Sequence, residues 1–102
     1  MPLFLEISKH NPESCPLVNE KVRKLNVDLM AKWDELSKKY NIKTVGMWAS
    51  LSEHLMVAVY DAPNYEALVK VSMEPEVMNW GCYSTTEIRQ VLTGEEAVKM
   101  MT

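Results

Sequence analysis

The sequence predicts an α+β domain of the ferredoxin-like type, in which two helices cover one face of a four-stranded antiparallel sheet in the split order β-α-β-β-α-β. Two observations predict it. Apolar positions switch between a two-residue period and a three-to-four-residue period along the chain, and turn residues separate these segments. The 102 residues, 47% hydrophobic and 25% charged, have the size and composition of one globular unit. We therefore assign residues 1–102 to a single domain.

The first two elements are a strand and a long helix. Residues 3–8 alternate between apolar and more polar side chains, which predicts a half-buried strand. After turn residues 11–14, one apolar stripe predicts a helix that begins at Pro16, because proline suits the first helical position. The stripe consists of Val18, Val22, Leu25, Leu29, Trp33, Leu36 and Tyr40.

The second half of the chain supplies the other strands and two further helices. Residues 42–51 and 55–60 predict a hairpin whose second strand is central. Asn64 is a good cap for the next helix, and a short helical turn follows from Pro75. Residues 83–92 predict an edge strand. Thr93 and Glu96 form a capping-box pattern, which predicts a short terminal helix over about 94–101.

The alternation also predicts which way each strand faces. Odd-numbered residues of the first three strands are uniformly apolar, so we expect them to face the helices. In the last strand we expect Ile88 to face the helices. Even-numbered residues, including Glu6, Trp48 and Tyr60, would then line the bare face of the sheet. That face needs a cover, and pairing of two sheets in a homodimer, a dimeric α+β barrel, or in a higher multiple of dimers provides it.

Composition argues against several classes of protein. The formal net charge of −3 leaves no basic stripe for nucleic acid. No apolar run approaches the roughly 20 residues that cross a bilayer. The amino terminus M-P-L-F-L-E-I lacks the basic region of a signal peptide, and two cysteines without secretory context indicate reduced thiols. We therefore expect a cytoplasmic protein that binds neither nucleic acid nor membrane.

Two motifs resemble a known group of proteins. The run I-K-T-V-G-M-W-A-S-L-S-E-H-L-M-V-A-V-Y-D-A-P-N-Y-E-A-L resembles the middle of the small GYD-type and related uncharacterised ferredoxin-like families. The opening H-x-P-E-x-C-P, together with E-H before the third strand, resembles one branch of them. The resemblance implies a dimeric barrel. Such families include monooxygenases, isomerases, haem proteins and proteins of no assigned activity, and fold alone does not choose among these.

The chemistry-bearing residues gather at one predicted edge of the sheet. His10 and Cys15 follow the first strand, His54 lies in the hairpin, and Cys82 precedes the last strand. Two imidazoles and a thiolate suit zinc or copper, so we expect a metal site of His10, Cys15 and His54, with Glu13 or Cys82 as further candidate ligands. The plainer interpretation is that the histidines cap turns through hydrogen bonds and Cys15 is a small buried hydrophobe.

Other functions are compatible with the same residues. Cys15 at the start of a helix would be an activated nucleophile with His10 or His54 as its base. Alternatively, a ligand cavity on the bare face, walled by Trp48, Tyr60 and Trp80, would support cofactor-independent proton or oxygen chemistry, with haem ligation as a variant. A third alternative is an assembly module whose sheet faces only pair subunits. The sequence decides neither the substrate nor whether the protein is an enzyme.

Overall fold

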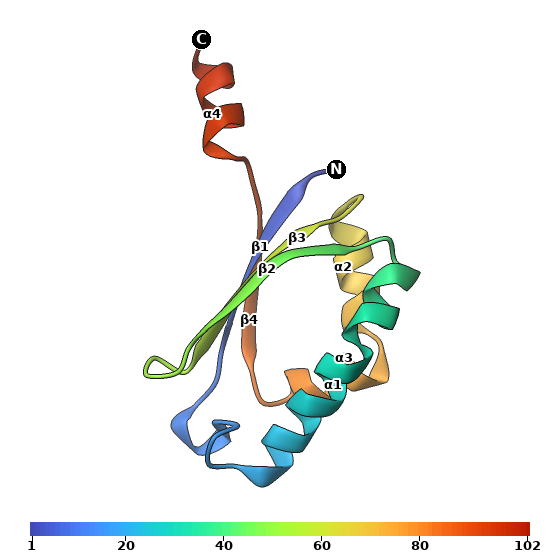
Figure 1. Cartoon of the computed structure of the whole chain (residues 1–102), viewed down its shortest axis with the longest axis vertical. Helices are drawn as coiled ribbons and strands as arrows, with labels where there is room; N and C mark the ends of the chain where they lie inside the picture. Colours follow the sequence, from blue (N-terminus) through green and yellow to red (C-terminus); the bar gives the residue numbers. More distant parts are fainter.

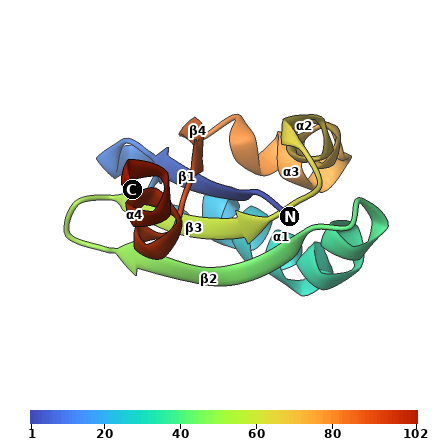
Figure 2. The same cartoon turned by 90° about the horizontal axis from the view of Figure 1, so that it is seen from above.

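The protein is described from a computed structural model that covers residues 1–102. Its sheet is antiparallel and has the strand order β2-β3-β1-β4, which Figure 2 shows from above. The fold is therefore the predicted α+β arrangement, with the first and third strands in the centre. The elements are β1 (Leu3–Lys9), the short 3₁₀ helix η1 (Pro12–Ser14), α1 (Glu20–Lys39), β2 (Lys43–Ser50), β3 (Leu55–Asp61), α2 (Tyr65–Ser72), α3 (Pro75–Gly81), β4 (Thr85–Val91) and α4 (Gly94–Met101).

Three helices cover one face of the sheet. Figure 1 shows α1, α2 and α3 on the same side of the strands, while α4 stands beyond the end of the sheet. The capping box predicted for α4 is present, since Thr93 Oγ1 accepts from the Glu96 N–H and the Glu96 carboxylate accepts from the Thr93 N–H, both at 3.1 Å. None of the helices has the length and apolar character that a membrane crossing requires.

The predicted facing of β1 and β3 is wrong. The even-numbered residues turn toward the helices: Phe4 and Ala58 are buried in the core, with 2% and 0% of their surface exposed, and Tyr60 lies with them. Register agrees, because Phe4 pairs with Tyr60 across the two central strands. The odd-numbered apolar residues therefore lie on the bare face, so both faces of the central strands carry apolar side chains.

β2 differs from its neighbours because it contains an irregularity. The register shifts between Thr44 and Gly46, and from there Met47 pairs with Ala58 and Trp48 with Val57. Met47 therefore faces the helices, as predicted for an odd-numbered residue, and Trp48 has its predicted place on the bare face. In β4, Ile88 packs against the core, also as predicted.

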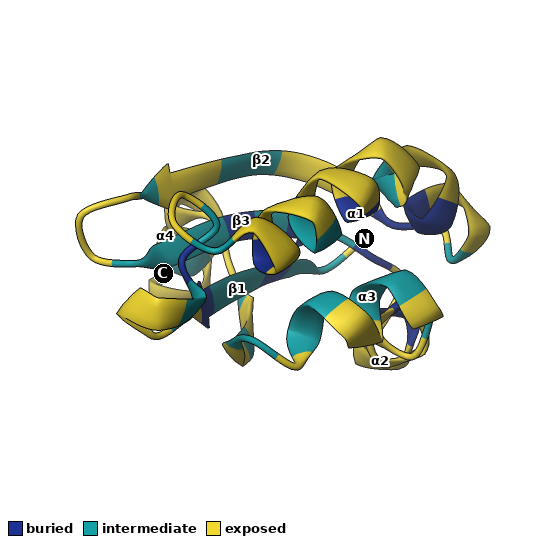
Figure 3. Cartoon of the chain, turned by 90° about the horizontal axis from the view of Figure 1, so that it is seen from below, coloured by how far each residue is buried: buried dark blue, intermediate teal, exposed yellow.

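α1 begins four residues later than predicted. Its cap is Asn19, whose side-chain oxygen accepts a hydrogen bond from the Val22 N–H at 3.1 Å. Val22 and Leu29 of the predicted stripe are buried, whereas Val18, which precedes the helix, is 72% exposed. Figure 3 shows the buried residues gathered in the central strands and in the helical segments that face them. Residues before Asn19 instead form η1 and a turn, and this shapes the site described next.

Candidate functional site

The end of β1 and the β2–β3 hairpin are tied together at one edge of the sheet. The His10 N–H donates to the His54 carbonyl oxygen at 3.1 Å, which extends the pairing of the two strands by one step. His54 closes the hairpin with a φ of 54°, a left-handed conformation that histidine adopts more readily than bulky or branched residues do. The backbone therefore fixes the two histidines beside each other.

Cys15 reaches the same place through a compact turn. Its N–H donates to the carbonyl of Pro12, the first residue of η1, and its own carbonyl accepts from the N–H groups of Val18 and Asn19. These bonds fold the chain back, and only 4% of Cys15 is exposed. Because α1 begins at Glu20, Cys15 is not at its first turn. The expected activation of this thiol by the helix amino terminus is therefore wrong.

The three side chains predicted to bind metal come together. One potential ligand atom from each of His10, Cys15 and His54 lies within 4.8 Å of the other two. The imidazole rings meet edge to face, with centroids 5.4 Å apart and an interplanar angle of 72°. His10 Nε2 and His54 Nδ1 are buried and have no hydrogen-bond partner. Orphaned polar atoms of this kind are rare in folded proteins, and a ligand would satisfy them.

The electrostatic surroundings favour a neutral His10. Burial lowers the pKa of its imidazole, and the neighbouring His54 lowers that pKa further. A neutral imidazole has a free lone pair, which metal coordination requires. The site thus holds a ready nitrogen donor and a buried thiol.

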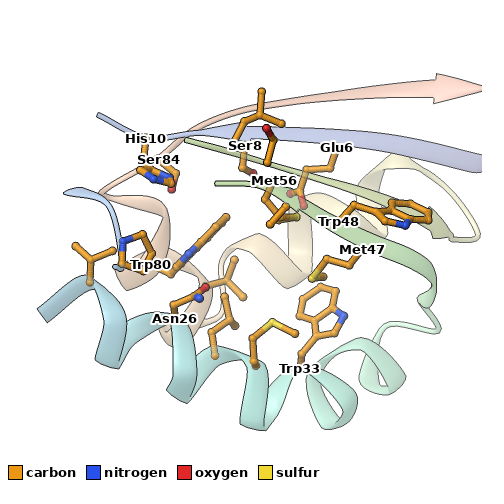
Figure 4. Close-up of a pocket in the computed structure, with 18 of the residues that line it drawn as sticks. Glu6, Ser8, His10, Asn26, Trp33, Met47, Trp48, Met56, Trp80 and Ser84 are labelled. Atoms are coloured by element: carbon orange, nitrogen blue, oxygen red, sulfur yellow. The ribbon is translucent and has the colours of Figure 1, made fainter. Parts of the chain in front are cut away.

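A cavity of about 410 Å³ opens beside this cluster, between the sheet and the helices. This is the size of a small-molecule site, and 18 of its 26 lining residues are hydrophobic. His10 and Cys15 line one part of it, and Figure 4 shows His10 and Trp80 toward one end with Trp33 toward the other. The cavity was expected on the bare face of the sheet, and the reversed facing of β1 and β3 moves it beneath the helices.

The residues predicted to bind a ligand have different positions. Tyr60 and Trp80 line the cavity. Trp48 lies at its margin, although its register places it on the bare face and 59% of it is exposed. Cys82 is exposed and lines a second, polar hollow together with His10. Glu13 is exposed in η1, and neither Glu13 nor Cys82 belongs to the His-Cys-His cluster.

Several lining residues were not predicted as site residues. Among them are Glu6, which the alternation places on the bare face, Trp33 of the apolar stripe in α1, and Asn26, and all of these border the cavity (Figure 4). Glu6 accepts a hydrogen bond from the Tyr60 hydroxyl at 2.8 Å. Burial raises the pKa of the Glu6 carboxyl, and this hydrogen bond opposes the increase. A lone carboxylate between apolar residues of a central strand was the available signal.

Comparison with solved structures supports the fold. The chain is similar to a crystal structure of an antibiotic biosynthesis monooxygenase, with a TM-score of 0.61 and 11% identity over 91% of this chain and 98% of that one. It is also similar to an uncharacterized NIPSNAP domain protein from Burkholderia xenovorans, with a TM-score of 0.52 and 9% identity over 92% and 97% of the two chains. A protein from Agrobacterium tumefaciens gives a TM-score of 0.52 and 11% identity over 92% and 96%.

These likenesses define the class of fold. At such identities they show a ferredoxin-like α+β fold and carry no activity with them. No protein-family model matches the sequence, and no curated protein matches it. The function must therefore be argued from the site of this chain.

Proposed function

We propose that this protein binds a transition metal ion, zinc or copper, through His10, Cys15 and His54, and that a small organic ligand reaches the metal from the adjoining cavity. The observation that carries the proposal is the orphaned pair of buried nitrogens, one on each histidine, beside a buried thiol. Nitrogen and thiolate donors are what zinc and copper prefer. Three protein ligands leave one tetrahedral position for water or a ligand.

The geometry of the cluster is close to that of a metal site. Around a tetrahedral zinc ion, ligand atoms at bond lengths of about 2.0–2.3 Å lie roughly 3.3–3.6 Å from one another. The three candidate atoms lie within 4.8 Å, so each must move by less than about 1 Å on binding. Small side-chain rotations supply such a shift, while the His10–His54 backbone hydrogen bond and the turn at Cys15 hold the backbone in place.

Metal content of protein purified without a histidine tag tests the proposal. We expect about one zinc or copper ion per chain in the wild type, and loss of most of it in His54→Ala and in Cys15→Ser. Cys82→Ser is the matched control, because Cys82 is exposed and outside the cluster, and it should keep its metal. Sub-stoichiometric metal in the wild type that these substitutions leave unchanged would refute the proposal.

The assembly is a second part of the proposal. The bare face of the sheet carries Leu5, Ile7 and Val57 in its centre, next to the largely exposed Trp48. An apolar surface of this extent is usually covered, so we place a second copy of the chain on it, which would give a dimeric barrel. The relation to GYD-type proteins and a cytoplasmic location, where both free cysteines stay reduced, belong to the same proposal.

A further inference from the structure

Glu6 is an acidic group without a cationic partner. It projects from β1 toward the helices, where the Tyr60 hydroxyl donates to one of its oxygens at 2.8 Å. None of the ion pairs of the protein includes Glu6. No lysine or arginine is among the residues that line the cavity. Carboxylates withdrawn from bulk water are usually paired with a positive charge, and here the chain does not provide one.

The walls of the cavity are aromatic. Trp33 and Trp80 line it, and the largely exposed Trp48 of the bare face reaches only its margin. Trp33 packs on Tyr60 with ring centroids 5.6 Å apart, and the hydroxyl of the same tyrosine donates to Glu6. The Trp33 indole and the Glu6 carboxylate therefore both contact Tyr60. The Trp33 indole N–H donates to Thr44 Oγ1 at 2.7 Å, which fixes the orientation of the ring. Faces of indole rings attract organic cations, by about 2 kcal/mol where water is excluded.

From these observations we infer that the cavity binds a small organic ammonium ion with an apolar body, with Glu6 as its counter-charge and Trp33 and Trp80 in its walls. The ammonium group satisfies the carboxylate through a charge-assisted hydrogen bond. Burial raises the pKa of the Glu6 carboxyl because it disfavours the charged form, and a bound cation would stabilise that charged form. This inference names the class of the cavity ligand and rests on the cavity part of the proposed function, but not on the metal.

The separation of Glu6 and His10 indicates how long a ligand between them can be. Glu6 and His10 are four residues apart on one face of the strand, which corresponds to about 13 Å. Figure 4 shows the space between them bordered by Met56 and Trp80. A ligand held by its ammonium group at Glu6 therefore extends an apolar body toward the histidine end.

Calorimetry at neutral pH with three related indoles tests the inference. Tryptamine carries an ammonium group, tryptophol a neutral hydroxyl group and indole-3-propionate a carboxylate, on the same aromatic body. We expect tryptamine to bind with a Kd at least about tenfold lower than that of tryptophol, which corresponds to about 1.4 kcal/mol. The propionate should bind most weakly, because it meets the like charge of Glu6. Equal binding of tryptamine and tryptophol, preference for the anion, or no binding of tryptamine would overturn the inference.

Matched variants assign the preference to one residue. Glu6→Gln keeps the shape of the side chain and should remove the preference for tryptamine over tryptophol. Glu87→Gln removes an exposed carboxylate of β4, outside the cavity, and should keep the preference. Circular dichroism and urea unfolding show whether Glu6→Gln is folded. If it does not fold, Glu6→Asp replaces it, and the preference should then shrink because the shorter carboxylate no longer reaches the same point. A preference that survives in folded Glu6→Gln would contradict the inference.

One further variant separates this inference from the metal proposal. His54→Ala should lose metal and still prefer tryptamine, because Glu6 and the tryptophans are intact. If the wild type holds no metal but prefers tryptamine, the metal proposal fails alone. If metal binds and tryptamine has no advantage, the present inference fails alone.

Discussion

Removal of the Tyr60 hydroxyl should show how much its hydrogen bond to Glu6 contributes to the free energy of unfolding. In Tyr60→Phe the aromatic ring stays, and with it the packing of a residue that is 4% exposed and lies against Trp33. What is lost is a 2.8 Å hydrogen bond to a carboxyl group. A hydrogen bond to a charged group contributes about 1.5–3 kcal/mol. Glu6 is only partly buried, and water can replace the hydroxyl. We therefore expect the free energy of unfolding to fall by about 1.5 kcal/mol at neutral pH.

The pH dependence of this loss follows from the direction of the pKa effect. The Tyr60 hydrogen bond lowers the pKa of Glu6, so it stabilises the carboxylate more than the carboxylic acid. Its loss raises that pKa further in the folded state. A carboxyl whose folded pKa is raised begins to destabilise the fold above its unfolded pKa, and the full penalty is reached once pH exceeds the folded pKa. The difference in free energy of unfolding between the wild type and Tyr60→Phe should therefore be largest at neutral pH. It should shrink as pH falls through the pKa of Glu6, toward the roughly 1 kcal/mol of a neutral hydrogen bond.

Urea unfolding at neutral and at acidic pH measures both quantities, at one fixed protein concentration because a dimer would unfold in a concentration-dependent way. The double variant Glu6→Gln/Tyr60→Phe closes a mutant cycle that isolates the coupling of the two residues. The reasoning is refuted if Tyr60→Phe costs less than about 0.5 kcal/mol at neutral pH, the size of an ordinary surface substitution. It is also refuted if the cost is the same at both pH values.

Two further predictions concern the thiols and the assembly. Iodoacetamide should modify the exposed Cys82 much faster than the buried Cys15, as followed by mass spectrometry; faster modification of Cys15 would instead favour a reactive thiol. Leu5→Lys, which places a charge in the centre of the bare sheet face, should convert a dimer into monomers in analytical ultracentrifugation while metal content stays unchanged. Lys24→Glu, on the exposed side of α1, is the control and should remain dimeric, whereas a Leu5→Lys dimer would argue for another interface.

The fold and the approach of His10, Cys15 and His54 to one another were predictable because both follow from connectivity. Once the strand order is known, the end of β1 and the β2–β3 hairpin must share an edge, and this brings His10 and His54 together. Cys15 follows within a few residues. The start of α1 was not predictable from caps alone, since Pro16 and Asn19 are both acceptable helix starts. Asn19 is used because the turn before it closes on the Cys15 carbonyl.

The facing of the central strands could not be read from alternation, because both faces of these strands carry apolar side chains. Leu3, Leu5 and Ile7 are apolar and lie on the bare face, while the even-numbered side carries the core residue Phe4 together with polar residues. A pattern that compares only apolar with polar positions turns the more apolar set inward. It fails here because the inner set includes the polar residues Glu6 and Ser8, which line the cavity or are hydrogen-bonded inside the protein.

Those inward polar residues explain why one strand carries both halves of the proposed site. Glu6 and Ser8 of β1 and His10, directly after its end, occupy alternate positions of the chain and line the cavity. Ser8 is 3% exposed and lies 3.2 Å from the Thr86 hydroxyl, so the middle one of these residues is internally hydrogen-bonded. The two ends are not fully satisfied, since Glu6 lacks a cation and His10 Nε2 lacks any partner. Polar groups left open at both ends of an apolar cavity cost stability, and the two proposed ligands would each offset that cost at one end.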